Sequence, residues 1–173
     1  MSLETTKSLK GALAQLYYRE ACDQKSWAYV SLEGINVQDS VVVFAKGSHR
    51  ISIRLPAQTV AEIKEISKLG SKEKPVFDYL ACKVNQREKY EGVMVGNPTA
   101  LTWVQVKTAK SEFSDKEVTA LEKIKIPLAL FYVRDVLVQP QKIEVKWVTR
   151  TGDEWLDELD DKRDQAESDD DYL

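Results

Sequence analysis

The sequence predicts a mixed α/β (α+β) fold arranged around one sheet. Helical spacing of apolar residues in three segments, strand-like apolar runs between them, and a 43% hydrophobic content lead to this prediction. A chain of 173 residues is long enough for one compact domain with its own core. Seven glycines and five prolines are too few for a low-complexity chain. Residues 1–150 are therefore expected to form a single domain.

The first predicted element is a helix over residues 6–25. Its apolar side chains recur at three- and four-residue spacing, so they form one face. These residues are Leu9, Ala12, Leu13, Leu16 and Tyr17. Either Thr6 or Ser8 can cap the helix start. The next residues, 26–32, alternate in polarity and predict a short strand.

Residues 31–74 predict a hairpin followed by a helix. The apolar runs 41–45 and 50–55 flank the turn residues Lys46-Gly47-Ser48, which favours a hairpin. Pro56 suits the start of the helix, and Gly70 suits its end.

The second half alternates strands with one further helix. Residues 76–84 and 101–109 predict two strands, separated by a polar stretch, 85–98, that is expected to be a loop. Ser114 begins a helix, and Glu117 three residues later fits a capping box. The last two predicted strands cover residues 126–138 and 142–148.

The charge of the chain is divided between body and tail. Residues 151–173 contain 11 acidic residues against Lys162 and Arg163, a net charge of −9. Residues 1–150 contain 23 Lys and Arg against 17 Asp and Glu, a net charge of +6. The tail is expected to be disordered or a loosely held short helix that serves solubility or a protein partner. The basic body is compatible with nucleic-acid binding.

Composition excludes several other classes of site. Two cysteines and one histidine cannot supply a Cys/His zinc framework or a dense set of disulfides. His49 would also have to be the base of any Ser-His-Asp or Cys-His system. No apolar stretch approaches the roughly 18 residues of a membrane span. The sequence therefore predicts a soluble, intracellular, cytoplasmic protein without membrane contact.

One group of polar residues on neighbouring predicted strands suits metal-assisted chemistry. Gln105 and Lys107 are separated by one residue, so a strand projects both to the same face. Asp78 lies on the adjacent predicted strand. Its carboxylate, the Gln105 side-chain carbonyl and the backbone carbonyl of Val106 are the hard oxygen ligands that Mg²⁺ prefers. Lys107 can then position a metal-activated water or offset charge on the phosphate.

The sequence around these residues resembles the PD-(D/E)XK nuclease superfamily. VFDYLACKV, then TWVQVKTAKSEFS, an amphipathic helix and the strand IPLALFYV follow the order of that core, and KGALAQLYYREA resembles its first helix. The similarity is greatest to the branch with Gln in place of the acidic residue, which includes group I intron homing endonucleases. Holliday junction resolvases are more distant relatives. The resemblance covers residues 8–31 and 75–133.

This resemblance implies a restriction-endonuclease-like fold and a role for each matching residue. Asp78 would bind metal, Gln105 would be the second ligand, and Lys107 would be the catalytic lysine. The family's first helix usually carries a Glu, where this chain has Gln15. Glu20, five residues later, is an imperfect substitute. Residues 31–74 are an insert relative to the minimal core.

The resulting expectation is a Mg²⁺-dependent DNA endonuclease, for which Mn²⁺ can replace Mg²⁺. It would act on duplex or branched DNA, as a homodimer or tetramer because a chain this small holds one site. Nearby basic residues are expected to contact phosphates. They are Lys10, Lys83, Arg87, Lys89 and Lys110. The alternative is a non-catalytic module, binding nucleic acid or protein, on a degenerate nuclease scaffold.

A second acidic-x-Lys group is the main competing site in the sequence. Glu144 and Lys146 follow Asp135 across the Pro140 turn, and here the acid is a glutamate. The superfamily core needs a helix and a strand after its lysine. Only Lys107 is followed by both, so the Asp78 group is preferred.

Overall fold

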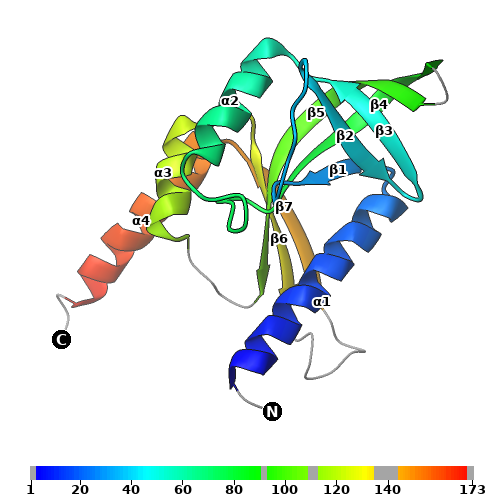
Figure 1. The fold of residues 1–173 in the computed structure, drawn as a ribbon. Coiled ribbons are helices and arrows are strands. Elements are labelled where there is room, and N and C mark those ends of the chain that lie inside the picture. Colours follow the sequence, from blue (N-terminus) through cyan, green and yellow to red (C-terminus); the bar gives the residue numbers. More distant parts are fainter. Residues whose placement is uncertain (1–2, 91–92, 109–112, 135–143, 171–173) are drawn as a thin grey trace.

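The structure, a computed structural model, describes residues 3–90, 93–108, 113–134 and 144–170. Within these ranges the chain forms four helices and seven strands. In chain order they are α1 (Leu3–Gln24), β1 (Ala28–Ser31), β2 (Val41–Lys46), β3 (His49–Arg54), α2 (Ala57–Ser67), β4 (Tyr79–Tyr90), β5 (Val93–Thr108), α3 (Asp115–Lys123), β6 (Leu128–Arg134), β7 (Glu144–Arg150) and α4 (Gly152–Asp170). The predicted mixed α/β class is confirmed (Figure 1).

All seven strands belong to one sheet, in the order β3-β2-β1-β4-β5-β6-β7. The long strand β5 has different neighbours along its length. Its first half pairs in parallel with β3, starting at Ile51↔Met94, and its second half pairs in parallel with β6, starting at Trp103↔Leu128. Since β3 also connects to β4 through β2 and β1, the first five strands close a ring.

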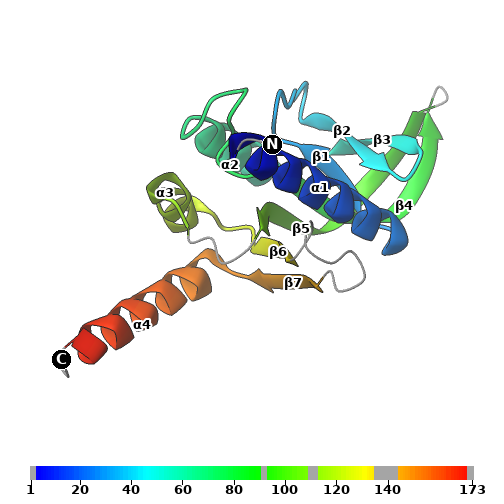
Figure 2. The same cartoon turned by 90° about the horizontal axis from the view of Figure 1, so that it is seen from below.

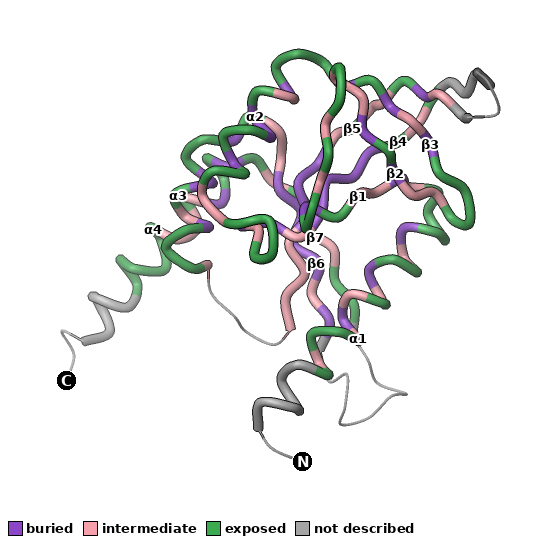
Figure 3. The backbone as a smooth tube through the Cα atoms, in the orientation of Figure 1, coloured by how far each residue is buried: buried purple, intermediate pink, exposed green. Residues whose placement is uncertain are grey.

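Helices cover both faces of this sheet and enclose two apolar clusters (Figures 1 and 2). Helices α2 and α3 and the start of α4 pack on one face, and α1 packs on the other. Neighbouring residues of β5 show the division, because Trp103 lies in the first cluster and Val104 in the second. Figure 3 shows that buried residues concentrate along the central strands.

A buried carboxylate ties α2 to the segment between α3 and β6. Glu62 is 9% exposed, and its Oε1 accepts hydrogen bonds from Trp103 Nε1 at 3.2 Å, Lys125 N at 2.7 Å and Ile126 N at 3.2 Å. Three donors on one buried oxygen satisfy groups that would otherwise be unpaired in the core. This contact fixes the position of the loop from which β6 begins.

The predicted hairpin and helix within residues 31–74 are present as β2, β3 and α2. The hairpin extends the main sheet instead of forming a separate layer. The polar stretch 85–98, predicted to be a loop, is not one: β4 continues to Tyr90, and β5 already begins at Val93. Pairing with β3 helps to extend β5 into this region. Residues 85–98 contain Asn, Gly and Pro, which are typical of loops, so the sequence pattern did not indicate the non-local pairing.

The acidic C-terminal segment is also more ordered than the sequence predicts. Of the two predicted alternatives, a disordered tail or a loosely held short helix, residues Gly152–Asp170 form a helix, α4, that is long and is attached to the body. Trp155 attaches the helix: it is 4% exposed, its Nε1 donates to Leu128 O at 2.9 Å, and its ring contacts Phe113. A side chain at Gly152 would place its Cβ 2.4 Å from Leu121 O, so the start of α4 lies directly against α3. The rest of α4 extends away from the sheet (Figure 2).

Candidate active site

Asp78 lies immediately before β4, at the point where β5 continues past the end of its neighbour. Its backbone N–H donates to Val104 O at 3.0 Å, and its carbonyl accepts from Leu32 N at 3.0 Å. Its side-chain Oδ2 accepts from Val106 N at 2.8 Å. Val106 lies beyond the start of β4, so no main-chain carbonyl of β4 can accept from its N–H. The Asp78 carboxylate accepts this hydrogen bond instead. This arrangement fixes Asp78 beside the second half of β5.

Lys107 lies one residue beyond Val106 and makes an ion pair with α3. Its Nζ is 2.9 Å from Glu117 Oε2 and 3.0 Å from Glu117 Oε1, and both side chains are 10% exposed. The Phe113 ring centroid is 5.9 Å from the same Nζ. A shielded pair of this kind holds the ammonium group in one place.

Glu117 is the residue of this site that the sequence reasoning missed. The predicted cap at Ser114 is present, because Ser114 Oγ accepts from Glu117 N at 3.3 Å. The Glu117 carboxylate, however, bonds Lys107. A glutamate at the third position of a capped helix reads as a capping box. Its direction toward β5 depends on how α3 packs, which no local pattern reveals.

Gln105 precedes Lys107 by two residues on β5, so their side chains leave the strand on the same face. Its Oε1 is buried and has no hydrogen-bond partner within the described part of the chain. A buried carbonyl oxygen without a donor is costly unless a ligand satisfies it. Gln105 therefore supplies a free acceptor close in sequence to the Lys107–Glu117 pair.

Helix α1 brings Gln15, and not Glu20, to the site. The Gln15 side chain hydrogen-bonds the Asp78 carboxylate. Glu20 is exposed and lies about 140° further around the helix. The position where the resembling family usually has Glu thus faces the site in this chain, but it holds a neutral amide.

The surroundings of Asp78 raise the pKa of its carboxyl group. Burial is the largest cause, and the carboxylate of Glu117 acts in the same direction. The Val106 N–H, the Gln15 side chain and the Lys107 ammonium oppose the shift by stabilising the charged form. The ionised form of Asp78 is therefore less stable in the folded protein than in water, as is common for carboxylates at functional sites.

Replacing Asp78 with Asn is expected to stabilise the protein near neutral pH in the presence of a chelator. With its pKa raised above the ordinary 3.8, folded Asp78 binds its proton more tightly than unfolded Asp78. Its contribution to stability is therefore present below pH 3.8 and is lost as pH rises through the folded-state pKa. Asn keeps an acceptor for Val106 N–H without the buried charge.

Urea unfolding measures this difference directly. The Asn variant should have the larger free energy of unfolding near neutral pH, and the gain should shrink below pH 3.8. A variant less stable than the parent near neutral pH would show that Asp78 is held without strain.

The basic residues expected near the site are spread along the structure. Lys83 is five residues along β4 from Asp78, roughly 16 Å away, and its Nζ lies over the Trp27 ring. The register Arg87↔Gly96 places Arg87 roughly 30 Å from Asp78, and Lys89 lies still further along the strand. These strand residues therefore lie at increasing distance from Asp78, because β4 continues past the predicted loop. Their contacts with phosphates stay a prediction.

Two further predicted phosphate contacts have different outcomes. Lys10 is half-buried on α1, about 7.5 Å along the helix axis from Gln15. Lys110 lies outside the described residues. The competing group on β7 is at the sheet edge, with Lys146 exposed and opposite Tyr132, and its Asp135 also lies outside the described residues.

The donor set at the site is oxygen-rich but has few charges. Across residues 3–90, 93–108, 113–134 and 144–170, no three His, Cys, Asp or Glu side chains gather in a metal-binding group. The Glu117 carboxylate and the Gln15 amide lie near Asp78, whereas Gln105 is placed by its position on β5, two residues before Lys107. Carboxylate and amide oxygens are ligands for Mg²⁺, and they do not suit softer metals.

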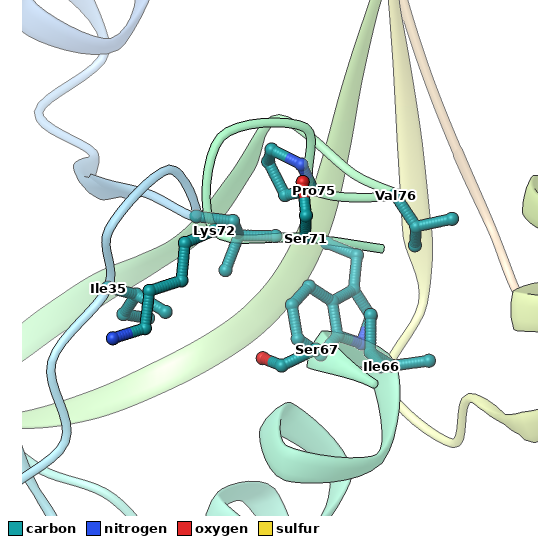
Figure 4. Close-up of a pocket in the computed structure, with 9 residues that line it drawn as sticks. Ile35, Ile66, Ser67, Ser71, Lys72, Pro75 and Val76 are labelled. Carbon is teal, nitrogen blue, oxygen red and sulfur yellow. The ribbon is translucent and has the colours of Figure 1, made fainter. Parts of the chain in front are cut away.

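A separate pocket on the α2 side is not part of this site (Figure 4). It has a volume of about 110 Å³ and is lined mainly by apolar side chains over Trp103, with Lys72 at its rim. Ser67 and Ser71 contribute hydroxyl groups. It combines no carboxylate with a nucleophile or base, so no chemistry is assigned to it.

Comparison with protein-family models, curated proteins and solved structures gives no match for this chain. None of the helices in the described ranges combines the length and the apolar character that a membrane span requires.

Proposed function

We propose that this chain is a Mg²⁺-dependent DNA endonuclease that hydrolyses phosphodiester bonds at Asp78, Gln105 and Lys107. One observation carries the proposal: the Asp78 carboxylate is fixed by Val106 N–H within electrostatic reach of the Lys107 ammonium. A fixed carboxylate beside a fixed cation provides a place for a metal ion and a place for a phosphate. The two groups come from neighbouring strands, as the sequence motif requires.

The order of elements supports a restriction-endonuclease-like core. Helix α1 is followed by β1, β4 and β5, which pair antiparallel in that order. Helix α3 then connects β5 to β6, which lies parallel to β5. The resemblance found in the sequence implies this succession, with Asp78 at the start of the second core strand and Lys107 on the third.

The residues present fit a hard divalent cation. Asp78 Oδ atoms and the buried Gln105 Oε1, which has no partner in the described part of the chain, would hold the ion, with the Val106 carbonyl as a further ligand. Glu117 adds a second carboxylate near Asp78, and so supplies a negative charge that the neutral amide of Gln15 does not. When bound, the cation would polarise the phosphate and acidify a water molecule. Mn²⁺ can serve in the same role.

The protein groups have distinct tasks in this scheme. Asp78 and Gln105 set the position of the reacting phosphate relative to β5. Lys107 places its positive charge where negative charge grows on the phosphorus oxygens during water attack. Glu117 keeps the Lys107 side chain in a single orientation. Attack by water on phosphorus breaks one P–O bond, and the leaving oxygen takes a proton.

A single site per chain implies cleavage of one strand at a time. We therefore propose that two or four copies assemble when both strands of duplex or branched DNA are cut. Each copy would supply one Asp78 site.

One observation favours the second candidate, a binding module on a degenerate scaffold. The Lys107 ammonium is paired with Glu117, and both side chains are 10% exposed. With Gln15 and Gln105 both neutral, such a site has less charge to hold a cation than one with three carboxylates. This candidate predicts DNA or protein binding without cleavage.

Cleavage assays separate the two functions. Purified protein should nick supercoiled duplex or cut branched DNA when Mg²⁺ or Mn²⁺ is added, and the activity should stop when a chelator removes the metal. Absence of any nicking with either metal, from protein that is folded by circular dichroism, would favour the binding module.

A further inference from the structure

Two half-buried tryptophans lie together at the far end of α1 from the chain's N-terminus. Trp27, just before β1, and Trp147 on β7 have ring centroids 5.7 Å apart with an interplanar angle of 43°. Trp147 packs against the buried Tyr18 ring, at 5.8 Å, so its position is fixed from beneath. The pair forms the outer edge of the aromatic cluster under α1.

A lysine ammonium group lies over each of these rings, in a position that a stacking base would take while the ammonium moves to a phosphate. Lys25 Nζ lies 5.1 Å from the Trp147 ring centroid, and Lys83 Nζ lies 5.4 Å from the Trp27 centroid. Lys46 joins Trp27 in lining a pocket of about 180 Å³ beside the turn between β2 and β3. We name the surface formed by Lys25, Trp27, Lys46, Lys83 and Trp147 the tryptophan face. The end of α1 meets that turn, where Gly47 N donates to Asp23 Oδ1 (Figure 1).

Among the described side chains, one carboxylate shares this surface, and its charge is partly engaged. Asp23 also lines the pocket, and its Oδ1 accepts from Gly47 N at 3.2 Å. In the part of the chain that the structure describes, Lys25 and Lys83 at the rings outnumber the one aspartate at the pocket, which leaves the face positively charged.

We propose that the tryptophan face binds an unpaired nucleic-acid strand, with bases against the indole rings and phosphates at the lysines. Flat aromatic rings stack with any base, and lysines beside them contact the backbone without reading sequence. A duplex hides its base faces, so it cannot use the rings. The combination of ring faces and ammonium groups selects single strands.

The location connects this surface with the candidate site. Trp147 is the cross-strand partner of Phe131, which is the partner of Val106, whose N–H holds Asp78. Two strand spacings correspond to roughly 10 Å. The inference deepens the proposed function and rests on it for one point only, that the bound strand is the substrate. It predicts that branched or partly unpaired DNA is preferred over plain duplex.

The acidic helix α4 of a second copy is the other occupant that charge would allow. Its apolar residues Trp155, Leu156 and Leu159, however, pack against the core of their own chain. Apart from these, the described side chains of α4 are mostly acidic and offer no ring or base to cover the tryptophans. Nucleic acid matches both components of the surface, so it is the occupant we assign.

Strand binding is measured by titrating the full chain with a single-stranded deoxyoligonucleotide of about 12 nucleotides, a chelator being present. Indole fluorescence should be quenched, because Trp27 and Trp147 are the partly exposed tryptophans whereas Trp103 and Trp155 are buried. The double variant Lys25→Glu/Lys83→Glu should lose about tenfold or more in affinity. Trp27→Leu should reduce both the quenching and the affinity.

The matched control is Lys64→Glu/Lys68→Glu, which makes the same charge change at exposed positions on and just after α2. It should lose less than about threefold. Equal losses in the two double variants, no loss in either, or equal affinity for duplex of the same length would overturn the proposal. So would self-association that Lys25→Glu/Lys83→Glu abolishes while strand affinity is unchanged.

The outcome is separable from that of the nuclease proposal. Asp78→Ala should retain strand affinity, since Asp78 does not belong to the tryptophan face. Selective loss of affinity in Lys25→Glu/Lys83→Glu, from a protein that never cleaves, would support the face and reject the nuclease. Unchanged affinity in that variant, from a protein that cleaves, would do the reverse.

Discussion

Asp78→Ala is expected to lower the rate of Mg²⁺-dependent DNA cleavage by about two to three orders of magnitude or more, with the fold retained. Asp78 is the carboxylate that Val106 N–H fixes just before the start of β4, and its removal takes a full negative charge from the proposed cation site. Initial rates of supercoiled DNA nicking measure the effect. Circular dichroism and urea unfolding show whether the variant is folded.

Asp160→Ala serves as the matched control, because Asp160 is exposed on α4 and belongs neither to the candidate site nor to the tryptophan face. Its cleavage rate should stay within about threefold of the parent. The single variant Lys107→Met should also lose cleavage activity, as Asp78→Ala does. Because Lys107→Met leaves Glu117 buried without its cation, Lys107→Met/Glu117→Gln provides a second test in which that charge is also removed. Full activity in folded Asp78→Ala or in this double variant would exclude the site.

Trp155→Ala is expected to cost about 3–5 kcal/mol in the free energy of unfolding. The indole is 4% exposed, it contacts Phe113 with ring centroids 5.7 Å apart, and its Nε1 donates to Leu128 O. Truncation leaves a cavity and an unpaired carbonyl where α4 meets the body. Urea unfolding gives the value.

Trp155→Phe separates the two contributions, since it keeps an aromatic ring but loses the hydrogen bond. It should cost less, about 1–2 kcal/mol. A loss below about 1 kcal/mol for Trp155→Ala would mean that α4 is held by other contacts or is not docked in solution.

The elements that the sequence predicts well are those whose pattern is local. Apolar residues at helical spacing placed α1, and Pro56 and Ser114 marked the starts of α2 and α3. The turn Lys46-Gly47-Ser48 identified the hairpin of β2 and β3, where Gly47 has a φ of +58° that glycine adopts without strain. Each of these signals depends on residues within one or two turns of one another.

The features that the sequence did not reveal depend on distant partners. Residues 85–98 read as a loop because their pairing with each other and with β3 cannot be seen in composition. The charge of the acidic segment predicted disorder or a loosely held short helix, whereas the buried Trp155 attaches a long helix to the body. Ring closure by β3 and β5 joins strands that are more than forty residues apart in the chain.

The candidate site shows the same division. Gln105 and Lys107 could be assigned to one strand face from their spacing alone, and the meeting of Asp78 with β5 followed from strand order. Glu117 could not be assigned, because its contact with Lys107 is set by the packing of α3 against the sheet. The sequence showed Gln15 at the position where the resembling family usually has Glu. The structure adds that the Gln15 side chain hydrogen-bonds Asp78.

The most direct measurement is a calorimetric titration with Mn²⁺ of the parent chain and of Asp78→Ala, with DNA absent. Binding to one site per chain in the parent, and no detectable binding in folded Asp78→Ala, is the predicted result. Either an absence of binding to the parent or equal binding to both proteins would contradict the assignment of the cation to Asp78.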